Sequence, residues 1–417
     1  MKRRAGGLWR HPDFLKLWAG ESVSLLGSQV TELALPLTAV LTLQATPARL
    51  GLLGAARYLP FLFVTPLAGL WADRRPRRQT MILADIGLAI LVGSIPLAAV
   101  LGVLRMEILY LASFLIGALR AFFELAYQSY LPVLVERASL VEGNSKMQAS
   151  ASAAQIGGPG LAGVLVEWIG APLALTADAI SFLASAIGLA LIRKPEKPPA
   201  AARAGSSALH QVAEGFRWVL GSPMLRGLAA GATTFNIFSA VIETVLVLYA
   251  VRDLEIRAGT LGVIFAAGSV GSLLGAFLAA PTSSRFGLGR AFMVSALIAG
   301  LGTLLLPLAS GPALFGAMVL TLAQFIHGVG ASWGQVYGWS VRQAATPPGM
   351  LGRMNAAYRF FVTGLAPLGA LLGGILGGSI GPRSTLLVGA MGLLLSVLWY
   401  GFSPLPSLAR LPEAEGA

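Results

Sequence analysis

Residues 69–78 read Gly-Leu-Trp-Ala-Asp-Arg-Arg-Pro-Arg-Arg, which places five charged side chains within ten residues. Apolar stretches near 48–72 and 80–103 flank this segment, and each is long enough to cross a bilayer at about 20 residues per span. A short charged segment between two such stretches is typical of a loop that joins two membrane-spanning helices. Its four arginines favour the cytoplasmic side of the membrane. The segment therefore indicates a polytopic membrane protein with this loop inside.

The composition of the whole chain agrees with this interpretation. Of 417 residues, 56% are hydrophobic and only 12% are charged, whereas soluble domains carry about 25% charged residues. The chain has no cysteine, and its three histidines, His11, His210 and His327, are scattered. We therefore expect no metal centre and no cofactor. Since the sequence also lacks a Walker A motif and a membrane nucleophile with its partners, we expect a protein that is not an enzyme.

The apolar pattern predicts an all-α polytopic membrane protein with twelve transmembrane helices in two six-helix halves. An N-terminal half over 1–192 and a C-terminal half over 223–403 are joined by a linker over 193–222. Within the linker, Ala208 to Leu220 has the spacing of a short amphipathic helix, and 404–417 is a tail. The spans are predicted near 17–43, 48–72, 80–103, 107–130, 144–168, 171–192, 224–250, 258–280, 290–309, 313–338, 353–377 and 383–403.

The distribution of basic residues predicts the orientation. With the N-terminus inside, 22 of the 30 Lys and Arg residues fall on the cytoplasmic side and five on the opposite side. This bias follows the positive-inside rule. We expect a multi-pass protein of the inner (cytoplasmic) membrane with both termini in the cytoplasm. The net charge of +12 then reflects topology, and we expect no nucleic-acid partner.

The two halves align with each other at an offset of 211 residues. Glu32 meets Glu243, Arg74 meets Arg285, and further matches occur at Gly117 with Gly328 and Ser129 with Ser340. Pro159 and Pro367 correspond at a slightly smaller offset. An ordered internal repeat of this kind predicts two parallel, pseudo-symmetric halves with a substrate site between them near the bilayer midplane.

The segment 69–78 resembles the signature G-x-x-x-D-R-x-G-R-R/K of the major facilitator superfamily, with Pro76 in place of the second glycine. The resemblance implies alternating access and a cytoplasmic gate between helices 2 and 11. Gly69 would allow close helix approach, and Asp73 would face the N-terminus of helix 11. An alternative is that the arginines only fix the orientation. The gate residues implied are Gly69, Asp73, Arg74, Arg77, Arg78 and Arg353.

A second resemblance concerns predicted helix 5. Residues 157–163 are similar to the antiporter motif G-x-x-x-G-P-x-x-G-G at Gly158, Pro159 and Gly163, although Ala154 and Ala162 replace glycines. The wider stretch from Arg120 to Phe182 resembles the branch of bacterial macrolide-type multidrug exporters and the enterobactin exporter. This resemblance implies efflux and leaves the cargo open.

Glu32 and Glu243 are the first candidates for chemistry inside the membrane, where ionisable residues are costly. Burial disfavours the charged form of a carboxyl group, so each can exchange a proton as its surroundings change. The two glutamates therefore predict a proton-coupling pair or a recognition site for cationic cargo. A structural hydrogen bond to a neighbouring helix is the alternative.

Other ionisable residues form a second group. Arg120 and Glu124 are spaced i to i+4, which permits a helix-internal pair. Arg120 also resembles an arginine that many family members use for coupling, although the usual R-x-x-Q-G pattern is absent. Asp178 and Asp85 are expected to titrate or to satisfy local packing. Glu21 is expected to reach the lipid headgroups.

Aromatic and amide side chains on the predicted cavity helices are candidates for binding cargo by stacking and hydrogen bonding. The alternative is that they face lipid or fill helix contacts. The candidates are Gln29, Phe122, Tyr127, Phe235, Asn236, Phe238, Trp333, Gln335, Tyr337 and Tyr358.

Together these features predict a secondary active transporter. We expect proton-coupled efflux of amphiphilic small molecules, drug-like or siderophore-like, driven by the proton gradient. A lipid or lysolipid translocase on the same fold is the alternative, and a non-transporting scaffold or receptor is a third. The expected partners are a small-molecule substrate and membrane lipids, and we expect the protein to function as a monomer.

Overall fold

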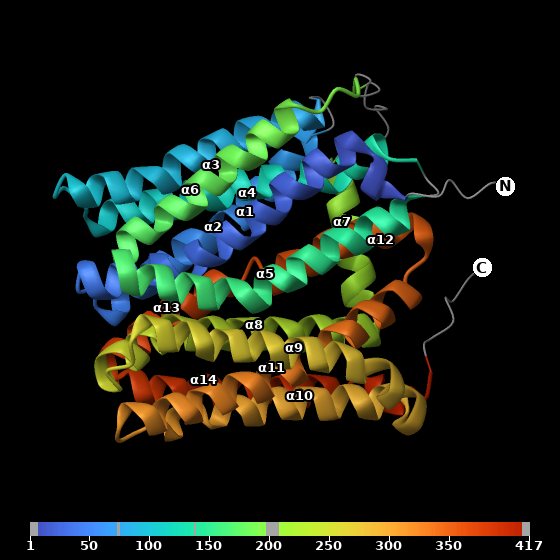
Figure 1. Ribbon diagram of the computed structural model, residues 1–417. Helices are drawn as coiled ribbons and strands as arrows, with labels where there is room; N and C mark the ends of the chain where they lie inside the picture. Colours follow the sequence, from blue (N-terminus) through green and yellow to red (C-terminus); the bar gives the residue numbers. More distant parts are fainter. Residues whose placement is uncertain (1–6, 73–75, 137–138, 197–207, 411–417) are drawn as a thin grey trace. The chain divides into compact units, whose positions relative to one another are not determined.

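The regular structure is helical throughout the residues that the computed structural model describes, which are 7–72, 76–136, 139–196 and 208–410 (Figure 1). In chain order the helices are η1 (Leu8–Arg10), α1 (Pro12–Leu37), η2 (Thr38–Thr42), α2 (Pro47–Ala72), α3 (Arg77–Val100), α4 (Met106–Leu134), α5 (Leu140–Ile169), α6 (Ala171–Ala190), α7 (Ala208–Gly221), α8 (Pro223–Leu248), η4 (Tyr249–Asp253), α9 (Ala258–Phe286), α10 (Leu288–Leu304), η5 (Leu306–Leu308), α11 (Ala313–Ala344), η6 (Pro348–Met350), α12 (Leu351–Val362), α13 (Ala366–Ser379), α14 (Pro382–Gly401) and η7 (Leu405–Ser407).

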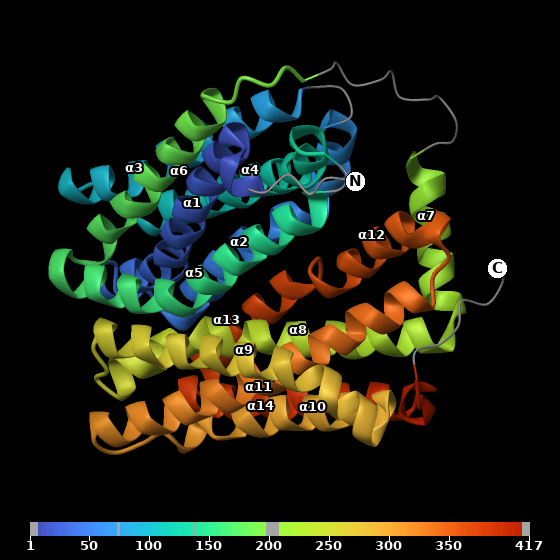
Figure 2. The ribbon, with the colours of Figure 1, turned by 45° about the vertical axis from the view of Figure 1, so that its right-hand side comes forward.

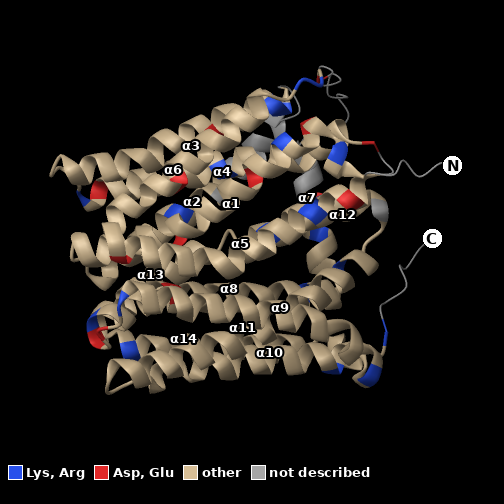
Figure 3. Ribbon diagram, in the orientation of Figure 1, with Lys and Arg blue, Asp and Glu red and all other residues tan. Residues whose placement is uncertain are grey.

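Ten helices among the described residues are long and apolar enough to span a membrane. The remaining two predicted spans correspond to α2 and α5, which have 26 and 30 residues and thus the length for a crossing. Only part of α2 has described side chains, and α5 carries polar residues such as Asn144 and Gln148 near its start. In Figure 3 most of the ribbon is free of charged residues, which gather toward the helix ends. The predicted all-α polytopic fold is confirmed.

Backbone contacts divide the chain into two compact units. The first unit comprises Met1–Gln44 and Leu59–Arg203, and the second comprises Ala45–Tyr58 and Ala204–Ala417. The division after Arg203 falls within the predicted linker. It also assigns the first part of α2 to the second unit.

In the first unit α1 packs against α5 and α6, and α3 packs against α4 and α6. Glycines on α1 permit a close approach to α6. A Cβ at Gly20 would stand 3.1 Å from the Ser185 Cα of α6, and one at Gly27 would overlap the Ser181 hydroxyl. Small residues let two membrane helices approach closely and gain dispersion energy along their length. The glycines therefore bring the polar residues of α1 next to α6.

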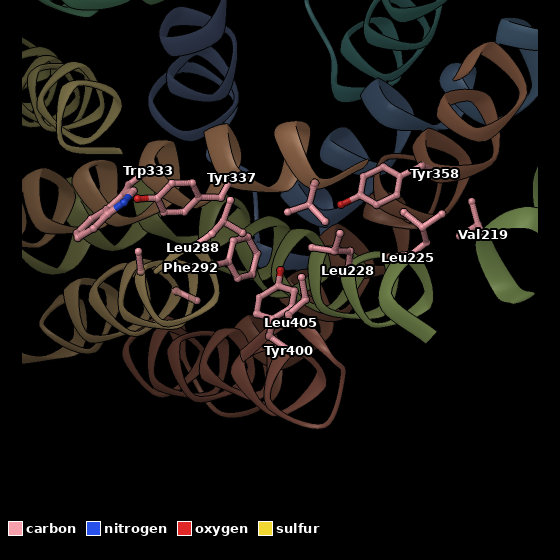
Figure 4. Close-up of a cluster of buried hydrophobic side chains, with 14 of the residues drawn as sticks. Val219, Leu225, Leu228, Leu288, Phe292, Trp333, Tyr337, Tyr358, Tyr400 and Leu405 are labelled. Atoms are coloured by element: carbon pink, nitrogen blue, oxygen red, sulfur yellow. The ribbon is translucent and has the colours of Figure 1, made fainter. Parts of the chain in front are cut away.

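The second unit contains two principal helix pairs, α9 with α11 and α8 with α14, and α10 packs between α11 and α14 (Figures 1 and 2). Its core is a cluster of buried side chains from five of these helices and the adjoining segments. Figure 4 shows aromatic members from α10, α11, α12 and α14. They include Phe292, Trp333, Tyr337, Tyr358 and Tyr400.

The internal repeat is visible in the backbone itself. Helices α1 and α8 begin at Pro12 and Pro223 and end at Leu37 and Leu248, so both pairs of ends are 211 residues apart. The same offset relates their π-helical extensions, η2 and η4, and relates the bounds of α6 to those of α14. Among the described residues, the two non-glycine residues with positive φ are Gln44 at 50° and Glu255 at 52°, and they are also 211 residues apart. These matches confirm the predicted pseudo-symmetric halves.

The predicted span at 353–377 is interrupted in the structure. Helix α12 ends at Val362 and α13 begins at Ala366. The backbone amides of Thr363 and Gly364 both donate to the Arg359 carbonyl, which breaks the regular helical ladder. Pro367 has no amide hydrogen and therefore occupies the first turn of a new helix. The α12 and α13 segments together correspond to one crossing.

Candidate functional site

An ion pair between α1 and α4 occupies the centre of the candidate site in the first unit. Arg120 Nη1 donates to Glu32 Oε1 at 3.3 Å, and the two side chains are 28% and 33% exposed. The pairing of Arg120 with Glu124 was expected from their spacing, but the ion pair of Arg120 crosses to another helix. Glu124 accepts from Gln128 Nε2 at 3.3 Å. The second terminal nitrogen of Arg120, Nη2, is buried without a hydrogen-bond partner in the described part of the chain.

Asp178 of α6 lies next to this ion pair and is fully buried. Its carboxylate accepts a hydrogen bond from Thr31 Oγ1 at 2.5 Å and lies 3.0 Å from Ser181 Oγ. The charges of Arg120 and Glu32 also act on it. A buried carboxylate is tolerated in the membrane when hydrogen bonds and a nearby cation compensate for lost water. Asp178 is therefore part of the same polar network as Glu32.

Glu243, the repeat counterpart of Glu32, lies in the second unit. Tyr58 donates its hydroxyl hydrogen to Glu243 Oε2 at 3.1 Å. Glu243 is exposed and Glu32 is half-buried, so neither has the full burial that was expected. The repeat relates their positions in sequence but does not give them equivalent surroundings. Both residues remain candidates for coupling or cation recognition.

The predicted gate is described only in part. Asp73 and Arg74 lie outside the described residues, as do the surroundings of Gly69 in α2. Arg77 and Arg78 begin α3, and their backbone amides donate to the Glu196 carboxylate at 2.9 and 3.1 Å.

Side chains strengthen this junction between α3 and the chain that follows α6. Arg77 Nη1 lies 3.2 Å from Glu196 Oε1, and Arg78 Nε donates to the Leu189 carbonyl at 2.7 Å. Glu196 thus caps the positive end of α3, and Arg78 neutralises the negative end of α6. The gating role of these residues stays a prediction.

Arg353 at the start of α12 pairs with the linker helix. Its Nη1 donates to Glu214 Oε2 of α7 at 2.5 Å. Gly215 allows this close approach, because a Cβ there would overlap the Arg353 carbonyl oxygen. Phe216 packs edge-on against Phe360 and Phe361, with ring centroids 5.2 and 5.1 Å away. The predicted amphipathic helix is therefore present and lies against α12.

One glycine of the antiporter-like motif in α5 packs against a neighbouring helix. A Cβ at Gly158 would overlap the Gln29 side chain of α1, whereas Gly157 and Gly160 have nothing within 4 Å. Pro159 and Gly163 are buried within the same uninterrupted helix. Gln29, a cargo-binding candidate, thus packs against α5.

The other cargo-binding candidates divide by environment. Trp333, Tyr337 and Tyr358 belong to the buried core of the second unit (Figure 4). Tyr337 donates to the Ala279 carbonyl at 2.5 Å, and the Tyr358 ring lies 3.8 Å from Arg342 Cζ. These contacts favour the packing alternative for Tyr337 and Tyr358. Trp333 is buried in the same core, but its Nε1 has no hydrogen-bond partner among the described residues.

Four more of the cargo-binding candidates contact other residues of their own unit, and the side chains of two others are at least partly exposed. Phe238 fills the space beside Gly392, Phe235 stacks on His327 with centroids 5.8 Å apart, and Asn236 donates to Ala232 of its own helix. Gln335 is exposed and Phe122 is half-buried. Tyr127 stacks on Phe123 and lines a cavity in the first unit.

That cavity contains a residue whose role was predicted wrongly. Glu21 does not reach outward toward headgroups but is 8% exposed and lines the cavity. Gly20 packs its side of α1 onto α6, which turns the next residue inward. A sequence signal existed: Glu21, Leu25, Gln29 and Glu32 recur at helical spacing and share one face of α1. Asp85 of α3 is likewise fully buried and interacts electrostatically with Glu21 and Asp178.

Comparisons with known proteins agree with this architecture. Residues 8–414 match the family model described as transmembrane secretion effector. The multidrug efflux pump Tap of Mycolicibacterium fortuitum is 28% identical over 93% of this chain and 94% of its own length. The enterobactin exporter EntS of Escherichia coli O1:K1 is 26% identical, with coverage of 92% and 90%.

Solved structures match over nearly the whole fold. A bacterial homologue of the iron transporter ferroportin in its inward-facing state has a TM-score of 0.73 at 18% identity, covering 93% of this chain and 97% of that one. The nucleoside transporter NupG has a TM-score of 0.72 at 14% identity, covering 93% and 98%. At these identities the likeness concerns the fold alone. The match over residues 8–414 shows that this chain belongs to the transmembrane secretion effector family of membrane transporters within the major facilitator superfamily.

Proposed function

We propose that this transporter exports amphiphilic small molecules in exchange for protons, by alternating access. The observation that carries the proposal is the Glu32–Arg120 ion pair beside the buried carboxylate of Asp178. The names of the relatives, a multidrug efflux pump and an enterobactin exporter, support export as the direction.

The electrostatics of the ion pair support proton coupling. In a medium of low dielectric constant, a carboxylate and a guanidinium stabilise each other only while both are charged. A proton on Glu32 removes this attraction, whereas the electrostatic attraction between Arg120 and Asp178 remains. The charge distribution between α1, α4 and α6 therefore changes with each proton bound. This change is the event that we assign to coupling.

The direction of insertion belongs to the same proposal. We place the protein in the cytoplasmic membrane as a monomer with both termini inside, which the bias of basic residues supports. The segment 69–78 and Arg353 would then stand at the cytoplasmic gate. Amphiphilic cargo would enter from the cytoplasm or the inner leaflet.

The experiment that tests this function uses purified protein in liposomes with an imposed pH gradient. The cargo panel contains a cationic dye, a macrolide, a catecholate siderophore and a lysolipid. We expect accumulation of at least one soluble cargo against its gradient and loss of that accumulation when a protonophore is added. Transport that is equal with and without the pH gradient would refute coupling. Movement of the lysolipid alone would favour the translocase alternative.

A further inference from the structure

Glu21 is an acidic residue inside the first unit with incomplete compensation for its burial. Its side chain is on α1, nine residues after the helix begins, and the residue is 8% exposed. Carboxylate oxygen Oε2 is buried and has no hydrogen-bond partner among the described residues. An unpaired buried carboxylate costs several kcal/mol in a real protein. Burial of Oε2 is therefore not compensated by a hydrogen bond from any described residue.

The cavity beside Glu21 has the size of a small-molecule site. Its volume is about 740 Å³, within the range of about 300–1,000 Å³ found for ligand pockets. Its wall combines Leu25 of α1, Tyr127 of α4 and, from α5, the polar side chains of Asn144, Gln148 and Ser152. An apolar and aromatic wall with a few hydrogen-bonding groups suits an amphiphile.

Glu21 is the one charged residue among those described as lining this cavity. Lys146 lies between two lining residues in the sequence, Ser145 and Met147, but its side chain contacts other groups. Its Nζ lies 3.8 Å from the centre of the Trp9 ring and 3.4 Å from Glu142 Oε1. An ionised Glu21 would therefore give the cavity a negative charge that Lys146 does not neutralise.

We propose that this cavity binds the positively charged group of an organic cation, with Glu21 as counter-ion and the Tyr127 ring as an additional face. The inference rests on the proposed export function, because it names the substrate class. A carboxylate supplies charge attraction, and an aromatic ring stabilises a cation through its electron-rich face. A bulky ammonium or phosphonium group needs no directed hydrogen bonds, so the amide and hydroxyl groups of α5 remain available to the rest of the cargo.

The position of this site separates it from the Glu32–Arg120 pair. Glu21 and Glu32 are eleven residues apart on one face of α1, which corresponds to about 16 Å along the helix axis. The cavity lies near the start of α1 and α5 and toward the end of α4. The predicted topology puts these ends at the cytoplasmic side, where an exporter loads its cargo. Recognition of the cation and exchange of the proton would then use different carboxylates.

Equilibrium binding of tetraphenylphosphonium to the purified full-length protein tests the inference without a gradient or transport. This probe carries a permanent charge, so its own titration does not contribute. We expect Glu21→Gln to weaken binding by about thirtyfold or more, the lower end for removing one partner of a buried charge pair. Glu167→Gln, at the exposed far end of α5, should bind like the parent protein.

A second pair of variants keeps the test independent of folding. Tyr127→Phe preserves the aromatic face and should bind the probe normally, whereas Tyr127→Leu should bind it more weakly. Glu21→Gln should melt at the same temperature as the parent or higher, since it removes an unpaired charge. Displacement of the probe by lysophosphatidylcholine would identify a lipid headgroup as the cation source, and failure to displace it would indicate a free organic cation.

Two outcomes would overturn the cation site. They are parental affinity in Glu21→Gln and no binding of the probe to the parent protein. Each leaves the proposed export function open to its own test, because pH-driven transport of a neutral cargo does not require this cavity.

Discussion

Thr31 and Glu32 are consecutive residues of α1 that engage two different helices. Successive helical residues point about 100° apart, so Thr31 donates to Asp178 of α6 while Glu32 accepts from Arg120 of α4. The burial of Asp178 is complete, and its negative charge depends on these neighbours. A single turn of α1 therefore contacts a charged residue on each of two other helices, α4 and α6.

The hydrogen bond from Thr31 should contribute measurably to stability. Thr31→Val keeps the side-chain shape but removes a donor to the buried carboxylate, so we expect a loss of about 1–3 kcal/mol. The fall in melting temperature of the purified protein measures it. In the control Thr176→Val, the lost bond is to the Leu173 carbonyl of the same helix, and the effect should stay within about 0.5 kcal/mol. Equal melting temperatures for the two variants would contradict the assigned role of Thr31.

Helices α9 and α11 illustrate how glycine sets the distance between elements. A Cβ at Gly275 would overlap the Val329 carbonyl oxygen, and one at Gly271 would overlap that of Phe325. Backbone atoms cannot move aside as a flexible side chain can. The two helices therefore approach each other closely only because these positions lack a side chain.

Gly275→Ala should lower stability by about 1–3 kcal/mol, the usual cost of overpacking. Gly160→Ala is the matched control, because that glycine lies in a helix with nothing within 4 Å. There alanine should stabilise the helix by up to about 1 kcal/mol. Thermal unfolding of both variants checks the prediction, and a similar destabilisation of both would show that helix packing at Gly275 is not the cause.

The linker helix α7 should depend on its contact with α12. Glu214→Arg places two like charges together and should release α7, seen as faster hydrogen–deuterium exchange over residues 213–221. The double exchange Glu214→Arg/Arg353→Glu restores opposite charges and should restore protection. An exposed pair of this kind contributes only about 0.2–1 kcal/mol, so Glu214→Gln should have a small effect. Unchanged exchange in Glu214→Arg would mean that the aromatic contacts of Phe216 alone hold the helix.

At the scale of the whole molecule, the sequence is sufficient to predict most helices and the repeat. Apolar length and the 211-residue offset that relates most of the matched positions are properties of the chain alone, and the structure reproduces both. The break at 363–365 escaped prediction because an apolar run gives no sign of a lost hydrogen bond, although Gly364 and Pro367 were available signals. The sequence was a poorer guide to which side chains pair with each other. Spacing favoured Arg120 with Glu124, and only tertiary packing shows that Arg120 reaches Glu32.

The predicted topology is directly measurable because the sequence contains no cysteine. Gly221→Cys, at the end of α7, should be labelled by a membrane-impermeant maleimide only when the cytoplasmic face is accessible. Leu101→Cys, after α3, should be labelled from outside in intact cells. Both sites are exposed in the structure. Labelling in the opposite pattern would reverse the proposed direction of transport.

The central claim is that Glu32 and Arg120 couple cargo movement to protons. Its most direct test compares pH-driven accumulation with cargo exchange at equal pH in liposomes containing Glu32→Gln. We predict loss of accumulation with exchange retained, since the variant keeps the side-chain shape and loses the proton-binding group. Glu107→Gln, an exposed acid in the first turn of α4, should behave like the parent protein. Full pH-driven accumulation by Glu32→Gln, and by its combination with Glu243→Gln, would contradict the account.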